Sequence, residues 1–158
     1  MKKLFSIIAA ALIMTSVCSA SIPVGSFVGI NIVIDGEKKD VPENMGTAFV
    51  LNYRTFVPTR YVLENFGYDV EYLPEDKQIM GMDKDGALFL MQIGSPYLFY
   101  KAADQTEVTK YEMDVCPEVD TDAGRVYIPL RALSEAMGYN VGYDSETLTV
   151  TINSAAKQ

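Results

Sequence analysis

The sequence contains no histidine and no tryptophan, and it has only two cysteines. Without histidine, a Ser-His-Asp or Cys-His nucleophile is impossible, and the zinc and copper sites that depend on imidazole are excluded as well. Acid–base chemistry near neutral pH would fall to carboxylates, lysine or tyrosine. We therefore expect a non-catalytic protein without a cofactor or a metal. The minor alternative is catalysis by two carboxylates in one cleft, one of them with a raised pKa.

Positive charge is scarce as well: 13 lysines and arginines stand against 21 aspartates and glutamates, which gives a formal net charge of −8 at pH 7. A chain this acidic is repelled by phosphate backbones and by anionic lipid surfaces. We therefore expect no nucleic-acid partner, and teichoic acids are disfavoured for the same reason.

After the first twenty residues, the sequence has no apolar run that approaches the roughly 20 residues of a transmembrane helix. The first twenty residues have a basic start at residues 2–3, an apolar run over residues 4–14 and a small-residue stretch at residues 18–20. This order is typical of a secretory signal peptide, with cleavage expected after Ala20. We expect a secreted or cell-wall-associated protein that does not insert stably into a membrane after cleavage.

Two other fates of the N-terminus stay open. Cys18 could be lipidated, although Val17 occupies the position where a small residue normally precedes such a cysteine. The apolar run could also be retained as an anchor. Cleavage after Ala20 would remove two lysines and no acid, so the net charge would move from −8 to −10. It would leave Cys116 alone, expected to be a small buried residue, with an intermolecular disulfide as the alternative.

Two segments of the chain match each other position by position. One runs from Arg54 to Tyr72 and the other from Arg125 to Tyr143. The identical pairs are Arg54 and Arg125, Pro58 and Pro129, Arg60 and Arg131, Glu64 and Glu135, Gly67 and Gly138, Tyr68 and Tyr139, Val70 and Val141, and Tyr72 and Tyr143. Such a repeat predicts a structural unit that was built twice.

Each copy has the pattern of a strand, a short helix and a second strand. The proline suits the first turn of a helix, and the glycine nine residues later suits its left-handed C-terminal cap. After the glycine, aromatic and apolar residues alternate with polar ones, as in a half-buried strand. We expect the tyrosines of this alternation to face the interior: Tyr68, Tyr72, Tyr139 and Tyr143.

The repeated pattern R-x-[FY]-[VI]-P-x-R, followed by E, G and an aromatic after V-x, resembles the copper amine oxidase-like N-terminal domain. The resemblance covers about residues 30–152. It departs from the family in two places, since Tyr72 and Tyr143 stand where tryptophan is usual, and residues 101–106 replace a short N-G turn.

The resemblance implies a module of secreted and cell-wall proteins of Gram-positive bacteria, usually present as tandem half-repeats. It implies an α+β fold in which antiparallel strands wrap around a helix. It implies no reaction, because amine oxidase activity belongs to a separate domain with histidine copper ligands.

We therefore predict an α+β fold: two similar units of antiparallel strands, each packed on a short helix, forming one compact domain over residues 28–153. The half-repeats would cover about residues 28–94 and 95–153, and residues 154–158 would form a disordered tail. Outside the repeat, strands are expected at residues 30–34, 78–82, 87–93, 97–100 and 108–113.

Several side chains are candidates for a site. Arg60 with Glu64, and Arg131 with Glu135, have the spacing of an ion pair along a helix, with capping of neighbouring strand carbonyls by each arginine as the alternative. The acidic stretches at residues 83–86 and 120–124 are better explained as turns than as calcium loops. A glycan-stacking surface would use the tyrosines that we expect to be exposed: Tyr53, Tyr97, Tyr100 and Tyr111.

The sequence thus predicts a secreted, non-catalytic cell-envelope module whose partner would be cell-wall glycan or a surface protein. The alternative is a protein-interaction or inhibitor domain that acts on a secreted enzyme.

Overall fold

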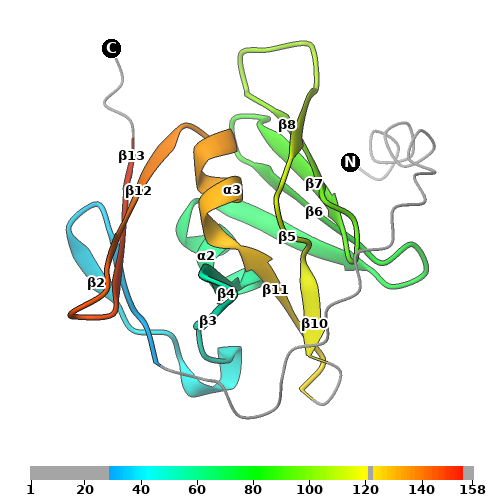
Figure 1. Ribbon diagram of the computed structural model, residues 1–158. Coiled ribbons are helices and arrows are strands. Elements are labelled where there is room, and N and C mark those ends of the chain that lie inside the picture. The colour runs from blue at the N-terminus through cyan, green and yellow to red at the C-terminus, as the bar shows by residue number, and fades with distance from the viewer. Residues whose placement is uncertain (1–28, 121–122, 155–158) are drawn as a thin grey trace.

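The computed structural model describes residues 29–120 and 123–154, and these form mostly antiparallel sheets with two short helices (Figure 1). The predicted α+β class is confirmed. The expected signal peptide with its cleavage at Ala20, the alternative roles of Cys18, and residues 155–158 of the expected tail lie outside the described residues.

The strands form three sheets. Sheet A has the order β12-β13-β1-β2, sheet B the order β10-β11-β4-β3, and sheet C the order β5-β6-β7-β8-β9. The bounds in sheet A are Asn31–Ile34 for β1, Glu37–Lys39 for β2, Tyr139–Asp144 for β12 and Thr149–Ser154 for β13. Those in sheet B are Phe49–Leu51 for β3, Arg54–Pro58 for β4, Glu118–Asp120 for β10 and Arg125–Pro129 for β11. Those in sheet C are Tyr68–Leu73 for β5, Gln78–Asp83 for β6, Leu88–Gln92 for β7, Tyr97–Lys101 for β8 and Thr109–Glu112 for β9.

The two α-helices have the positions that the repeat predicts. Helix α2 spans Thr59–Asn65 and helix α3 spans Leu130–Ala136, and a single 3₁₀ turn, η2, covers Glu43–Met45. Each proline is the residue just before its helix rather than the first helical residue. Gly67 and Gly138 follow the helix ends with φ of 86° and 81°, as a left-handed cap requires.

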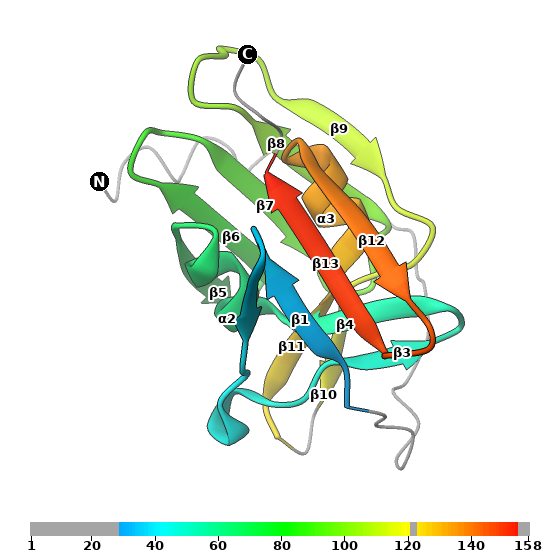
Figure 2. The ribbon, with the colours of Figure 1, turned by 90° about the vertical axis from the view of Figure 1, so that its left-hand side faces the viewer.

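One hydrophobic core joins sheets A and C through the helices, which lie between them (Figure 1). Figure 2 looks onto sheet A, with α3 behind it. Core residues come from all three sheets and both helices: Ile32, Val150 and Ile152 in sheet A, Val57 and Ile128 in sheet B, Val62, Leu63 and Leu133 in the helices, and Ile79, Phe89 and Leu98 in sheet C. A smaller aromatic cluster of Phe49, Phe56 and Tyr127 packs within sheet B.

Strand β1 joins the beginning of the described chain to its end. It pairs in parallel with β13, from Asn31 opposite Thr149 to Ile34 opposite Ile152. The remaining sheet pairings are antiparallel, and the turn at Asp35 and Gly36, with φ of 49° and 82°, connects β1 to β2 as expected of an Asp-Gly hairpin.

The pairing of β4 with β11 maps onto itself when the two copies are exchanged. Val57 lies opposite Ile128, its own counterpart in the second copy. On either side, Phe56 pairs with Pro129 and Pro58 pairs with Tyr127. Exchanging each residue for its counterpart turns one of these flanking pairs into the other. The surroundings of a motif residue in one copy are therefore supplied in part by the other copy.

One expectation about burial is wrong. Tyr72 and Tyr143 do not face the interior: their exposed fractions are 39% and 42%, and each lies near the end of its strand. Ser154, the first residue of the expected tail, is the last residue of β13, and its backbone N–H and its hydroxyl both donate to Oδ1 of Asp35, at 2.7 and 2.9 Å.

Candidate functional site

A cavity of about 370 Å³, which we call the first pocket, lies where the start of α2 meets the start of β11. Arg60 comes from α2 in the first copy of the motif, and Arg125 comes from β11 in the second. Apolar and aromatic side chains from the sheet beside α2 complete the wall: Val70, Tyr72 and Ile79. Among the described residues that line it, two are arginines and none is an aspartate or a glutamate.

Hydrogen bonds fix the walls of the first pocket. Thr59 donates its hydroxyl to the carbonyl of Val126 at 2.8 Å, which ties the start of α2 to β11. Arg125 donates from Nη2 to the carbonyl of Asn44 at 3.2 Å. Its stem packs closely over Gly46, where an added Cβ would lie 3.0 Å from Cδ of Arg125. This contact and this hydrogen bond hold Arg125 in the wall of the pocket.

A second cavity, of about 420 Å³, is lined by the counterparts of several of these residues, and we call it the second pocket. Arg54 and Arg131 line it, as Arg125 and Arg60 line the first pocket. Pro129, Ala132 and Thr55 likewise replace Pro58, Tyr61 and Val126. The symmetric pairing of β4 with β11 explains why one kind of pocket occurs twice.

The two pockets differ in charge. Three carboxylates line the second pocket: Glu112, Asp114 and Glu135. Asp114 forms an ion pair with Arg54, whose Nε lies 2.6 Å from Oδ2. The hydrogen bond from Arg54 lowers the pKa of Asp114, Arg131 lowers it further through its charge, and the same hydrogen bond raises the pKa of Arg54. The second pocket therefore already holds a carboxylate that is paired with Arg54, whereas no carboxylate is among the described residues that line the first.

The predicted pairings of the helix residues are only partly present. Nε of Arg60 and Oε1 of Glu64 are 3.9 Å apart, with both side chains about half exposed, so this pair contributes little to stability. Arg131 and Glu135 both line the second pocket. Carbonyl capping occurs at other arginines of the motif, since Arg125 bonds to Asn44 and Arg54 bonds to the carbonyl of Tyr53.

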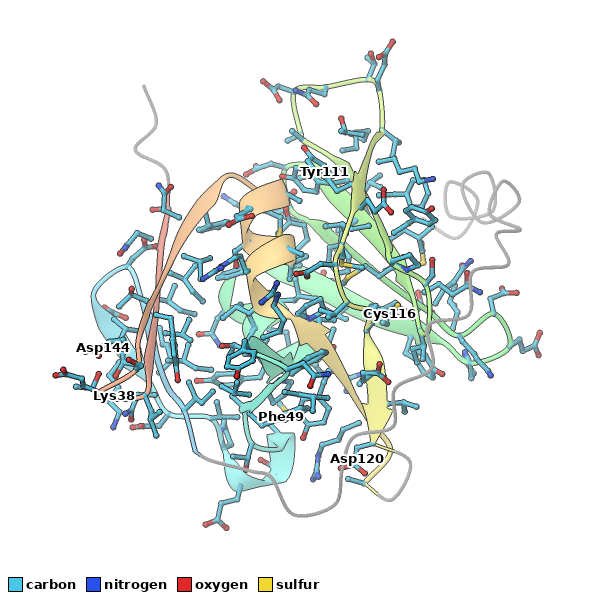
Figure 3. The ribbon with its side chains drawn as sticks, in the orientation of Figure 1. Lys38, Phe49, Tyr111, Cys116, Asp120 and Asp144 are labelled. Carbon is cyan, nitrogen blue, oxygen red and sulfur yellow. The ribbon has the colours of Figure 1, made fainter. Side chains whose placement is uncertain are left out.

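The four tyrosines proposed for glycan stacking do not share one environment. Tyr53 is 95% exposed and Tyr111 is 37% exposed. The Nζ of Lys110 lies 3.5 Å above the ring centre of Tyr97, and Tyr100 packs against the core. Tyr111 lines the second pocket and lies toward the upper end of the view in Figure 3, whereas Asp120, at the end of β10, lies toward the lower end.

The turn interpretation of the two acidic stretches agrees with their hydrogen bonds. Oδ1 of Asp83 accepts from the N–H groups of Asp85 and Ala87, and Oδ1 of Asp120 accepts from Ala123. Within residues 29–120 and 123–154, no three potential metal-ligating side chains cluster. Cys116 is 1% exposed, as expected of a small buried residue.

One carboxyl group has an unusual pKa. Burial raises the pKa of Glu118 to about 7, and no neighbouring charge contributes to this shift. Glu118 lines neither arginine pocket. It is therefore a buried acid on a strand rather than one of two carboxylates that share a cleft.

Sequence reasoning missed the pairing of arginines between copies. It placed Arg60 beside Glu64 within one helix, and it did not single out Thr59, Tyr61 or Asp114. A signal was present, because the chain has only four arginines and all four belong to the repeated motif. Each of the four lines one of the two pockets.

Comparison with known proteins gives one match. The family model described as Copper amine oxidase N-terminal domain matches residues 33–152. No curated protein and no solved structure gives a significant match. In the part of the chain that the structure describes, neither helix has the length or the apolar character needed to cross a bilayer.

Proposed function

Because the chain belongs to the copper amine oxidase N-terminal domain family, we propose that it is a secreted cell-envelope module that binds a wall or surface component. The family is one of non-catalytic accessory domains. The whole protein is in this proposal a binding protein without an activity of its own.

The observation that carries the proposal is the first pocket. Its two arginines and its partly exposed Tyr72 offer hydrogen-bond donors beside an apolar wall, which is the usual composition of a ligand site. Cell-wall peptidoglycan fits this wall, since sugar rings and alkyl groups can pack on the tyrosine while polar groups bond to the arginines. The glycan platform that we first expected at Tyr53, Tyr97, Tyr100 and Tyr111 is in this proposal replaced by Tyr72.

The module itself is in this proposal a duplicated unit. Elements β4, α2, β5 and β6 have counterparts in β11, α3, β12 and β13, with every boundary shifted by the same interval along the chain. The two copies differ in what their last strands pair with, because β6 pairs with β7 whereas β13 pairs with β1. Duplication supplied two related pockets, and later divergence left one of them open for a ligand.

Sedimentation with purified peptidoglycan sacculi tests the binding function. We expect the full chain to pellet with sacculi and Arg60→Gln/Arg125→Gln to stay largely in the supernatant, a loss of at least tenfold. Arg131→Gln, the matched change in the second pocket, should pellet like the unmodified chain. Failure of the unmodified chain to pellet would refute wall binding and favour the alternative of a partner protein.

Export is tested separately by intact mass, because the protein recovered from culture medium should begin at Ser21.

A further inference from the structure

In the second pocket, the arginines interact with a carboxylate that belongs to the chain itself. Asp114 places its carboxylate against Arg54 and within the charge field of Arg131. Asp114 lies four residues before the first residue of β10, Glu118. The residue at the same distance before β3 is Met45, and it lines the first pocket. A methionine thus stands in the first pocket where the second has its own carboxylate.

We propose that the first pocket binds a carboxylate group of the ligand between Arg60 and Arg125, in the role that Asp114 has in the second pocket. This inference rests on the proposed function and specifies the ligand group: a free carboxylate of the peptidoglycan stem peptides. A guanidinium group presents parallel N–H donors that match the two oxygens of a carboxylate, which a hydroxyl or an amide does not match.

The charge distribution of the pocket favours an acid from outside the chain. No aspartate or glutamate is among the described residues that line it, and the ion pair of Arg60 with Glu64 is long at 3.9 Å. Arg125 donates one hydrogen bond, from Nη2, to the carbonyl of Asn44. The partner of Arg125 in this bond is a neutral carbonyl, whereas Arg54 has an ion pair with Asp114. Asp120 lies opposite Arg125 in the pairing of β10 with β11, but it does not line the pocket.

The apolar wall limits which acids fit. Val70, Tyr72 and Ile79 form one side of the cavity, so a carboxylate attached to a small alkyl group suits it better than a bare inorganic anion. An alanine residue with a free C-terminus has this chemistry: a carboxylate for the arginines and a methyl group for the wall.

A titration followed by NMR tests the carboxylate without requiring the cell wall. The probe is N-acetyl-alanine, and its amide, N-acetyl-alaninamide, is the neutral control. We expect the acid to shift the backbone amide signals of residues 59–61 and 123–126, and the amide to shift them at least tenfold less at the same concentration. Equal effects of the two probes, or no effect of the acid at these residues, would overturn the inference.

The equivalent positions Met45 and Asp114 allow a second test, in which a carboxylate is added to the first pocket or removed from the second. Met45→Asp should place an internal carboxylate in the first pocket and weaken probe binding at least tenfold, whereas Met45→Asn should bind as the unmodified chain does. Asp114→Asn should release Arg54, and together with Glu112→Gln and Glu135→Gln, which remove the other two carboxylates of the second pocket, it should add shifts at residues 54–55 and 131–132. An unchanged affinity in Met45→Asp, with its thermal midpoint retained, would contradict the assignment. If Met45→Asp does not fold, Arg125→Gln decides, since it must abolish the shifts.

Sacculi whose carboxylates have been converted to amides separate this inference from the proposed function. We expect the full chain to pellet with untreated sacculi and not with amidated ones. Equal pelleting with both would leave wall binding in place and refute carboxylate recognition. Failure with both, together with a positive probe titration, would refute wall binding and leave the carboxylate site in place.

Discussion

At the scale of single residues, close packing fixes the identity of several glycines. Gly81, in the middle of β6, lies under the ring of Phe89 on the paired strand β7. A Cβ at this position would overlap the ring edge and would lie 3.1 Å from the carbonyl oxygen of Asp69. The ring has no room to move away, because it is 1% exposed and packs edge-on against Tyr68 at 5.5 Å.

Gly81→Ala should therefore destabilise the fold. We expect a loss of about 1–3 kcal/mol in the free energy of unfolding, the usual cost of forcing an extra methyl group into a packed site. Urea unfolding followed by far-UV circular dichroism measures it. Gly29→Ala is the control, since a Cβ there has no heavy atom within 4 Å. A change no larger than that of an ordinary surface substitution, about 0.5 kcal/mol, would mean that the Phe89 ring is free to shift.

Glu118 makes the stability depend on pH. Burial raises its folded pKa to about 7 from an ordinary value of 4.5, so the folded protein binds this proton more tightly than the unfolded chain does. The resulting penalty is absent below about pH 4.5, grows as the pH rises, and is complete above about pH 7. We expect Glu118→Gln to raise the free energy of unfolding at pH 8 by about 1–2 kcal/mol, a value that is reduced for partial screening by solvent. At pH 4 the substitution should change the free energy of unfolding little.

Thermal unfolding at several pH values checks this prediction. The difference in melting temperature between Glu118→Gln and the unmodified chain should increase between pH 4.5 and pH 7 and then level off. Glu107→Gln, a change at an exposed loop position, should give no such trend. A difference that is the same at pH 4 and pH 8 would show that the carboxyl of Glu118 is not shifted in the folded state.

At the scale of elements, the helix ends and the hairpin turn could be predicted from the sequence, because short stretches of chain determine them. The proline at each helix start, the glycine after the helix and the Asp-Gly turn at residue 36 all act through neighbouring backbone. The glycines and the turn lie where they were expected, and each proline lies one residue before its helix. The parallel pairing of β1 with β13 joins residues more than a hundred positions apart, and no local pattern encodes it. The pockets were missed for the same reason, since each takes Arg60 or Arg131 from one copy and its partner arginine from the other.

The two helix ends should respond alike to substitution. Gly67 and Gly138 have φ of 86° and 81°, and a Cβ at either would have no heavy atom within 4 Å. The cost of Gly67→Ala and of Gly138→Ala therefore comes from backbone conformation alone, about 1 kcal/mol each. Asparagine tolerates this conformation better and should cost less at both positions. Urea unfolding measures the shift of the midpoint that each alanine variant causes relative to the unmodified chain. Shifts that differ severalfold between the two variants would argue against equivalent helix ends.

At the scale of the whole molecule, the sheets do not separate along the predicted half-repeats. Strand β7 lies before residue 94 and strand β8 after it, yet the two pair from Leu88 to Met91. Strand β1, from the first half, pairs with β13 at the end of the second. The core likewise draws on both halves, with Phe89 and Leu98 in sheet C and Ile152 in sheet A. Neither half can bury its own apolar surface without the other, so the chain should fold as one cooperative unit.

Two truncations in different sheets test this cooperativity. Ile152→Ala in sheet A and Met91→Ala in sheet C each remove a side chain that is at most 1% exposed, and each should cost about 2–5 kcal/mol. Because the halves share one core, both variants should lower the midpoint of the same single transition. Urea unfolding should give the same midpoint by far-UV circular dichroism and by tyrosine fluorescence. If the halves were independent, each variant would instead shift one of two resolved transitions and leave the other in place.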